Sequence, residues 1–128
     1  MSQTKKFDEA LATYKRHGWR LARVLARPET MEVLRASASV EAGGASYEGV
    51  VVSESDVDAM WFTRASQGGR EAWELRLVAE PPYALFELFE PDESEEDRED
   101  VRREMEARLR DYVSPREVSG EPRVEADG

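Results

Sequence analysis

The stretch that decides the fold is DAMWFTRASQGGREAWELRLVAEPPYALFELF, residues 58–89. Two runs rich in aromatic and aliphatic residues, 58–65 and 70–79, flank the turn sequence at 66–69, which is typical of a β-hairpin. Two prolines then end the second run, because proline cannot donate a backbone hydrogen bond. The chain becomes apolar again at residues 83–89. The stretch therefore predicts a meander of three antiparallel strands.

The apolar residues of the hairpin favour one register, in which the numbers of paired residues sum to 135. This register places Phe62 opposite Trp73 and Met60 opposite Leu75. A slip by one residue would place Phe62 opposite a polar side chain, so the pattern argues against it. The predicted register puts Trp61 on the other face of the hairpin, where a helix could bury it or a partner could bind it.

The strand predicted at 83–89 is apolar on both faces. Such a strand is usually covered on both sides, so it is either central or has an interface on its second face. One face carries Tyr83, Leu85 and Phe89, and the other carries Ala84, Phe86 and Leu88. We expect Trp61, Tyr83 and Leu85 to contribute to a ligand-binding or partner-binding surface.

Helical periodicity marks both ends of the chain. Phe7, Leu11 and Tyr14 form one apolar stripe of a helix that Thr4 can cap, and Gly18 ends it just after His17. A second helix, 95–113, follows Ser94 as its N-cap and carries acidic residues in its first turn. Its core-facing row is predicted to be Val101, Met105, Leu109 and Tyr112, and its solvated flanks to hold the pairs Glu99–Arg103, Glu104–Arg108 and Glu106–Arg110.

The secondary structure of residues 19–53 is less clear from the sequence. Residues 19–27 fit either a strand or a helix, and Gly18 before and Pro28 after them favour a short strand. Pro28 then begins a short helix, residues 39–48 form a loop, and residues 50–53 form a short strand. The sequence predicts one α+β domain at 1–113, an antiparallel sheet of four or five strands with about three helices, and a disordered tail at 114–128.

Composition and charge argue against several classes of protein. The chain has 128 residues, no cysteine and a formal charge of −10, although residues 1–39 have a net charge of +4. Such an acidic chain is repelled by phosphate backbones, so we expect no nucleic-acid binding. No segment is apolar enough for a membrane span or a secretory signal, which predicts a cytoplasmic protein. The use of Arg over Lys and the lack of Asn and Ile suggest a bacterial source.

Two groups of charged residues are candidate sites. Arg16, Arg20, Arg23 and Arg27 would line one side of a helix and could bind an anionic partner or the acidic run at 90–100. Glu54, Asp56 and Asp58 alternate along the chain and could hold a divalent metal, although the rest of a calcium-loop motif is missing. A turn or helix cap is the more ordinary role for these carboxylates.

The sequence carries no recognisable catalytic motif. Its single histidine, His17, lacks a neighbouring nucleophile, and neither glycine pair is followed by the residues of a phosphate-binding loop. We therefore expect a non-enzymatic bacterial protein-binding or adaptor domain without a cofactor, with a homodimer as one form of partnership. The alternative is a divalent-metal-dependent enzyme or ligand-binding protein that uses Glu54, Asp56 and Asp58.

Overall fold

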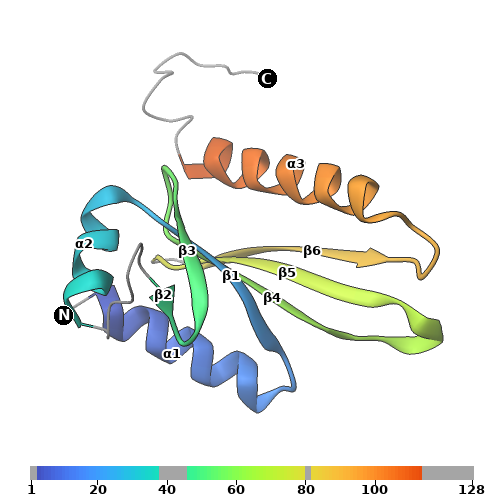
Figure 1. Cartoon of the computed structure of the whole chain (residues 1–128), viewed down its shortest axis with the longest axis horizontal. Coiled ribbons are helices and arrows are strands. Elements are labelled where there is room, and N and C mark those ends of the chain that lie inside the picture. Colours follow the sequence, from blue (N-terminus) through green and yellow to red (C-terminus); the bar gives the residue numbers. More distant parts are fainter. Residues whose placement is uncertain (1–2, 38–45, 80–81, 114–128) are drawn as a thin grey trace, which may run out of the picture.

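The computed structural model describes residues 3–37, 46–79 and 82–113. They fold into a single mixed sheet between two layers of helices, with α1 and α2 on one face and α3 on the other (Figure 1). The elements are α1 (Gln3–Arg16), β1 (Arg20–Ala26), α2 (Pro28–Ser37), β2 (Ser46–Tyr47), β3 (Val50–Glu54), β4 (Ala59–Ala65), a 3₁₀ turn η1 (Gln67–Gly69), β5 (Glu71–Leu77), β6 (Tyr83–Phe89) and α3 (Glu95–Val113).

The strand order in the sheet is β2-β3-β1-β4-β5-β6. The predicted meander is confirmed, since β4, β5 and β6 pair antiparallel in sequence order. The α+β class with three helices is also confirmed, but β1 pairs parallel to β3, which the sequence reading did not predict. The two-residue strand β2 lies within the span predicted as a loop, and its Tyr47 is buried in the core.

The α1 face of the sheet is the side that α1 and α2 cover. The apolar stripe of α1 lies there as predicted, buried against Val24, Met60 and Phe62 of the sheet and Leu34 of α2. Gly18 ends the helix with φ of 87°, a conformation in which a side chain would be strained. Thr4 lies inside the helix, which begins at Gln3, so the predicted capping role of Thr4 is wrong.

The α3 face is the opposite side. The Ser94 hydroxyl accepts a hydrogen bond from the Asp97 amide at 3.1 Å, so the predicted N-cap is confirmed. The predicted core-facing row is confirmed too, with Met105 and Leu109 fully buried and Val101 and Tyr112 packed against the same cluster. The predicted pairing of Glu99 with Arg103 is wrong: Glu99 pairs with Arg23 and Arg102, while Arg103 pairs with Asp100.

The predicted hairpin register is wrong by one residue. Phe62 lies opposite Glu74, and Trp73 lies opposite Thr63, so Phe62 and Trp73 are on different faces. A polar neighbour is tolerated at Phe62 because the Glu74 carboxylate accepts a hydrogen bond from the Tyr14 hydroxyl. The Tyr14 ring stacks on Phe62 with centroids 4.0 Å apart. A helix therefore supplies the partner that the strand alone did not reveal.

Residues 19–27 form the predicted strand, with an irregularity that matters for the arginines. Leu21 pairs with Phe62, but Arg23 pairs with Trp61, so the register shifts between these two residues of β1. Leu21 consequently packs into the core of the α1 face, while Arg23 lies on the same side as Trp61, beneath α3. The bulge breaks the alternation that a regular strand would give.

Candidate functional site

The three carboxylates predicted as a metal site lie in different surroundings. Asp58 is only 4% exposed, and its carboxylate accepts hydrogen bonds of 2.8 Å from the Gln3 side chain, the Arg27 amide and the Thr30 hydroxyl. It thereby joins the beginnings of α1 and α2 to the sheet. Glu54 and Asp56 are exposed. Among the described residues, no group of three or more His, Cys, Asp or Glu side chains could hold a metal ion.

The four predicted arginines do not form a stripe. Arg16 and Arg20 are exposed, at the end of α1 and the start of β1. Arg27 pairs with Glu29 and Asp58 beside α2. Arg23 forms two hydrogen bonds with Glu99, at 2.9 and 3.1 Å. The predicted contact between these arginines and the acidic run is therefore confirmed for one pair, within one chain.

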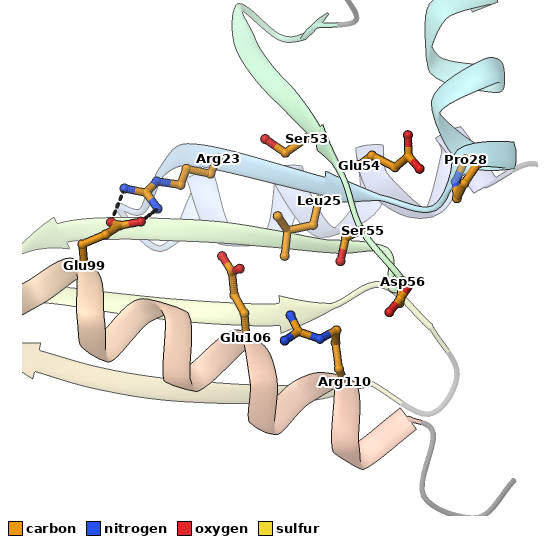
Figure 2. Close-up of a pocket in the computed structure, with 10 residues that line it drawn as sticks. All are labelled: Arg23, Leu25, Pro28, Ser53, Glu54, Ser55, Asp56, Glu99, Glu106 and Arg110. Carbon is orange, nitrogen blue, oxygen red and sulfur yellow. Dashed lines mark hydrogen bonds and ion pairs between the residues drawn. The ribbon is translucent and has the colours of Figure 1, made fainter. Parts of the chain in front are cut away.

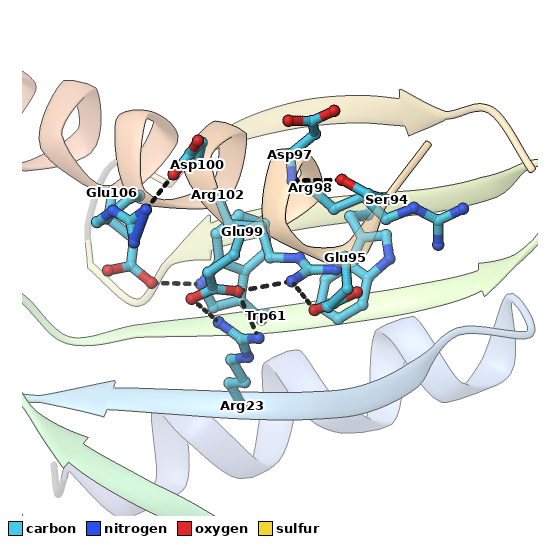
Figure 3. A network of polar contacts seen from close by, with 12 residues as sticks. Arg23, Trp61, Ser94, Glu95, Asp97, Arg98, Glu99, Asp100, Arg102 and Glu106 are labelled. Carbon is cyan, nitrogen blue, oxygen red and sulfur yellow. Dashed lines mark hydrogen bonds and ion pairs between the residues drawn. The ribbon is translucent and has the colours of Figure 1, made fainter. Parts of the chain in front are cut away.

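A network of charged side chains fastens α3 to the sheet (Figure 3). Its centre is Arg102, which is 2% exposed and donates to Glu99 at 2.7 Å and Glu95 at 2.9 Å. The guanidinium lies over the Trp73 ring, 4.1 Å from its centroid. Beside it the Trp61 indole is completely buried and donates to Glu106 at 2.8 Å. Of the two alternatives for Trp61, burial by a helix is therefore the one observed, because α3 covers it.

The network predicts acid sensitivity at Glu99. Its hydrogen bonds to Arg23, and to a smaller extent Arg102, lower the pKa of this carboxyl from 4.5 to about 2. The folded state therefore binds the proton less readily than the unfolded chain, and the stability from Glu99 is present above pH 4.5 and lost as the pH falls towards 2. Denaturant unfolding at neutral pH and at about pH 3 should show a smaller acid loss for Glu99→Gln than for the wild type. Equal losses would contradict this assignment.

A cleft of about 580 Å³ opens between α3 and the strands β1 and β3 (Figure 2). Charged side chains dominate its lining, which comprises Arg23, Leu25, Pro28, Ser53, Glu54, Ser55, Asp56, Glu99, Glu106 and Arg110. Several are already engaged, since Glu99 binds Arg23 and Glu106 accepts from Trp61. The cleft thus contains two of the three predicted metal-binding carboxylates and one of the four predicted arginines.

The other candidate surface lies along β6, the last strand of the sheet. Its α3 face is covered: Tyr83 stacks on Tyr112, and Leu85 packs against the core cluster there. Its α1 face carries Ala84, Phe86 and Leu88, the β6 strip, and all three residues are exposed. Phe86 is 55% exposed and Leu88 is 36% exposed. Trp19 packs edge-on against Phe86, with ring centroids 6.5 Å apart, and extends the apolar surface.

Comparison with protein-family models, with curated proteins and with solved structures finds no match for this chain. The candidate surfaces are therefore interpreted from their own geometry. None of the described helices is long and apolar enough to span a membrane.

Two of the side chains predicted to form a binding surface on the meander are covered by a helix. Tyr83 and Leu85 lie beneath α3, and the exposed apolar residues are Phe86 and Leu88. The alternating pattern of 83–89 did separate the two faces correctly, but it could not show which one a helix covers. Glu87 was a misleading signal, because it shares the face of Tyr83 and Leu85 and makes that face look like the solvated one, although α3 covers it.

Proposed function

We propose that this chain is a non-enzymatic protein-binding domain that binds through the outer edge of β6. The observation that carries the proposal is the exposure of Phe86 and Leu88 on an edge strand, beside backbone groups that no other described strand pairs with. An edge strand of this kind is a template for strand addition, in which backbone hydrogen bonds give affinity and alternate side chains give specificity.

The rest of the sheet supports this choice of surface. At the other end of the sheet, the short strand β2 pairs with the outer side of β3, and helices cover both faces of the middle strands. The rim of the β6 strip carries cations: Arg64 lies over the Trp19 ring, and Arg76 lies near the Tyr14 ring. A β6 strip with an apolar centre and a charged rim has the general composition of protein interfaces.

The test uses a photo-reactive phenylalanine analogue at position 86, in the cells that naturally make the protein. We expect a discrete crosslinked adduct from position 86 and none from the same analogue at Val33, a matched exposed apolar residue on α2. The adduct must disappear when Leu88→Glu is added, since that change places a charge on the same surface. Equal crosslinking at both positions, or none from position 86, would exclude β6 as the binding surface.

The second candidate is a ligand-binding protein that uses the cleft beside α3. The cleft volume of about 580 Å³ favours it, because it falls in the range of small-molecule sites. Its carboxylates and guanidinium groups would suit a small polar molecule, whereas a divalent cation would have only the exposed carboxylates Glu54 and Asp56, since no described group of three such side chains could hold it. Titration with Mg²⁺, Mn²⁺ and Ca²⁺ tests the cation: binding should raise the melting temperature, and Asp56→Ala should abolish the rise. No rise with any of the three removes the metal from this candidate.

A further inference from the structure

We propose that the partner of β6 is a second copy of this chain, which pairs antiparallel with β6 about a two-fold axis at Phe86. The proposal rests on the binding role of β6 and specifies its occupant. The two sheets would join edge to edge, and the α3 helices of the two copies would lie next to each other on one face of the joined sheet.

The edge itself has only one of the features that usually prevent such pairing, the inward-pointing charge of Glu87. β6 pairs with β5 over all seven residues without a bulge. It contains no Lys, Arg or Pro, and its one charged residue, Glu87, is on the α3 face. Natural sheets commonly protect an edge with inward-pointing charges, prolines or bulges. Pro82 and Pro91 stand outside the strand and limit the ladder to about its seven residues.

The strand is complementary to itself. Phe86 is the middle residue of Tyr83–Phe89, so an antiparallel copy centred there brings the full length of both strands together. Phe86 then lies opposite Phe86 of the partner subunit. Ala84 lies opposite Leu88 of the partner subunit, which places a small side chain across from a large one. Neither pairing on this face brings two charges together, so the paired strands add no local repulsion to the long-range repulsion between two chains of charge −10.

The direction of α3 determines which of its charged residues would meet the partner subunit. Arg98 lies over Phe89 and Tyr112 stacks on Tyr83, so α3 runs antiparallel above β6. At 1.5 Å per helical residue against about 3.3 Å per strand residue, the level of Phe86 falls near Met105. The proposed two-fold axis therefore lies level with the middle of α3, just outside the edge of β6.

The flank of α3 that would meet its copy carries opposite charges on either side of that axis. Glu99, Glu106 and Arg110 line the cleft on the β1 side of the helix. Helical geometry then places the exposed pair Glu104 and Arg108 on the opposite flank, towards the β6 edge. Across the axis Glu104 would face Arg108 of the partner subunit, and Arg108 would face the partner's Glu104. This charge complementarity favours a second copy as the occupant.

Sedimentation velocity of the full chain over a range of concentrations tests the dimer. We expect a species of twice the 14.6 kDa chain mass to grow with concentration. Phe86→Arg should raise the dissociation constant on the order of 30-fold, the effect of losing a central contact residue. Its far-UV circular dichroism should match the wild type, since Phe86 is more than half exposed. A chain that stays monomeric at every concentration would overturn the proposal.

Charge swaps on α3 test the geometry without touching β6. Arg108→Glu and Glu104→Arg should each weaken the dimer by bringing like charges together across the axis, and the double variant Glu104→Arg, Arg108→Glu should restore it. Arg103→Glu changes the net charge equally at an exposed site that the geometry turns away from the interface, and it should leave the dimer unchanged. Equal effects of Arg108→Glu and Arg103→Glu would overturn the proposed axis. A monomeric chain that still crosslinks from position 86 to a different protein would retain the binding role of β6 and reject only the second copy.

Discussion

Replacing Asp58 with Ala is expected to lower the free energy of unfolding by about 3–5 kcal/mol. The buried carboxylate accepts from the Gln3 side chain, the Arg27 amide and the Thr30 hydroxyl, each at 2.8 Å. Removing it leaves these donors without their acceptor and takes negative charge from the start of α2, where the helix dipole favours it. Urea unfolding followed by circular dichroism measures the loss.

Asp56→Ala is the matched control for this prediction. Asp56 carries the same side chain two residues earlier but is exposed, so its removal should change the free energy of unfolding by no more than about 0.5 kcal/mol. Asp58→Asn should fall between the two, because the amide retains one acceptor oxygen. Similar results for Asp56→Ala and Asp58→Ala would show that the carboxylate of Asp58 does not join the helices to the sheet.

Truncating Arg102 to Ala is expected to cost about 3 kcal/mol, whereas Arg102→Met should stay within about 1 kcal/mol of the wild type. The guanidinium lies between Trp73 and Phe89, 4.1 and 5.4 Å from their ring centroids, so Ala leaves a cavity beneath α3. Met fills most of that volume without a buried charge. The ion partners Glu95 and Glu99 remain partly in water and can be solvated when the cation is lost.

Guanidinium-chloride unfolding compares the free energies of unfolding of the two variants. It is followed by circular dichroism, because the contact with Trp73 would distort a fluorescence signal. Arg103→Met serves as the control, since Arg103 is exposed and should change stability by no more than about 0.5 kcal/mol. If Arg102→Met is as damaging as Arg102→Ala, the ion pairs rather than the packing hold α3 in place, and this account of the network is wrong.

Local signals in the sequence predicted most elements of the fold. The cap at Ser94, the glycine at the end of α1 and Pro28 at the start of α2 each act within a few residues, so the sequence displays them directly. The parallel pairing of β1 with β3 was not predicted, because it joins strands separated by a helix and by residues outside the described ranges. Residues 114–128, predicted as a disordered tail, also lie outside them.

The register was mispredicted for a physical reason. The predicted register requires the bulky residues of the hairpin to share one buried face. In the structure, helices cover both faces of the sheet. When each face is buried, alternation no longer selects a register. The decisive contact is the hydrogen bond from Tyr14 to Glu74, between residues 60 positions apart. No pattern within the hairpin contains it.

The predicted binding surface on the meander failed to locate the exposed residues for a related reason: the sequence does not show which face of each strand a helix covers. For Trp61, burial by a helix and binding of a partner both stayed open, because the sequence does not show where α3 crosses the sheet. In the structure its indole reaches Glu106 beneath α3, and the surface left uncovered is the one around Phe86. Of the two alternatives for the strand at 83–89, a central position is wrong, because β6 is the last strand of the sheet, and an interface on its second face stays a prediction.

Disulfide formation between single-cysteine variants tests the β6 contact most directly, because the chain has no cysteine of its own. Opposite residues of antiparallel strands have Cα atoms about 4.5–5.5 Å apart, within reach of a disulfide. Under mild oxidation, Phe86→Cys should form a covalent dimer on the order of tenfold faster than Val33→Cys, because pairing raises the local thiol concentration. Equal rates for the two variants would contradict the claim that β6 pairs with a second copy of this chain.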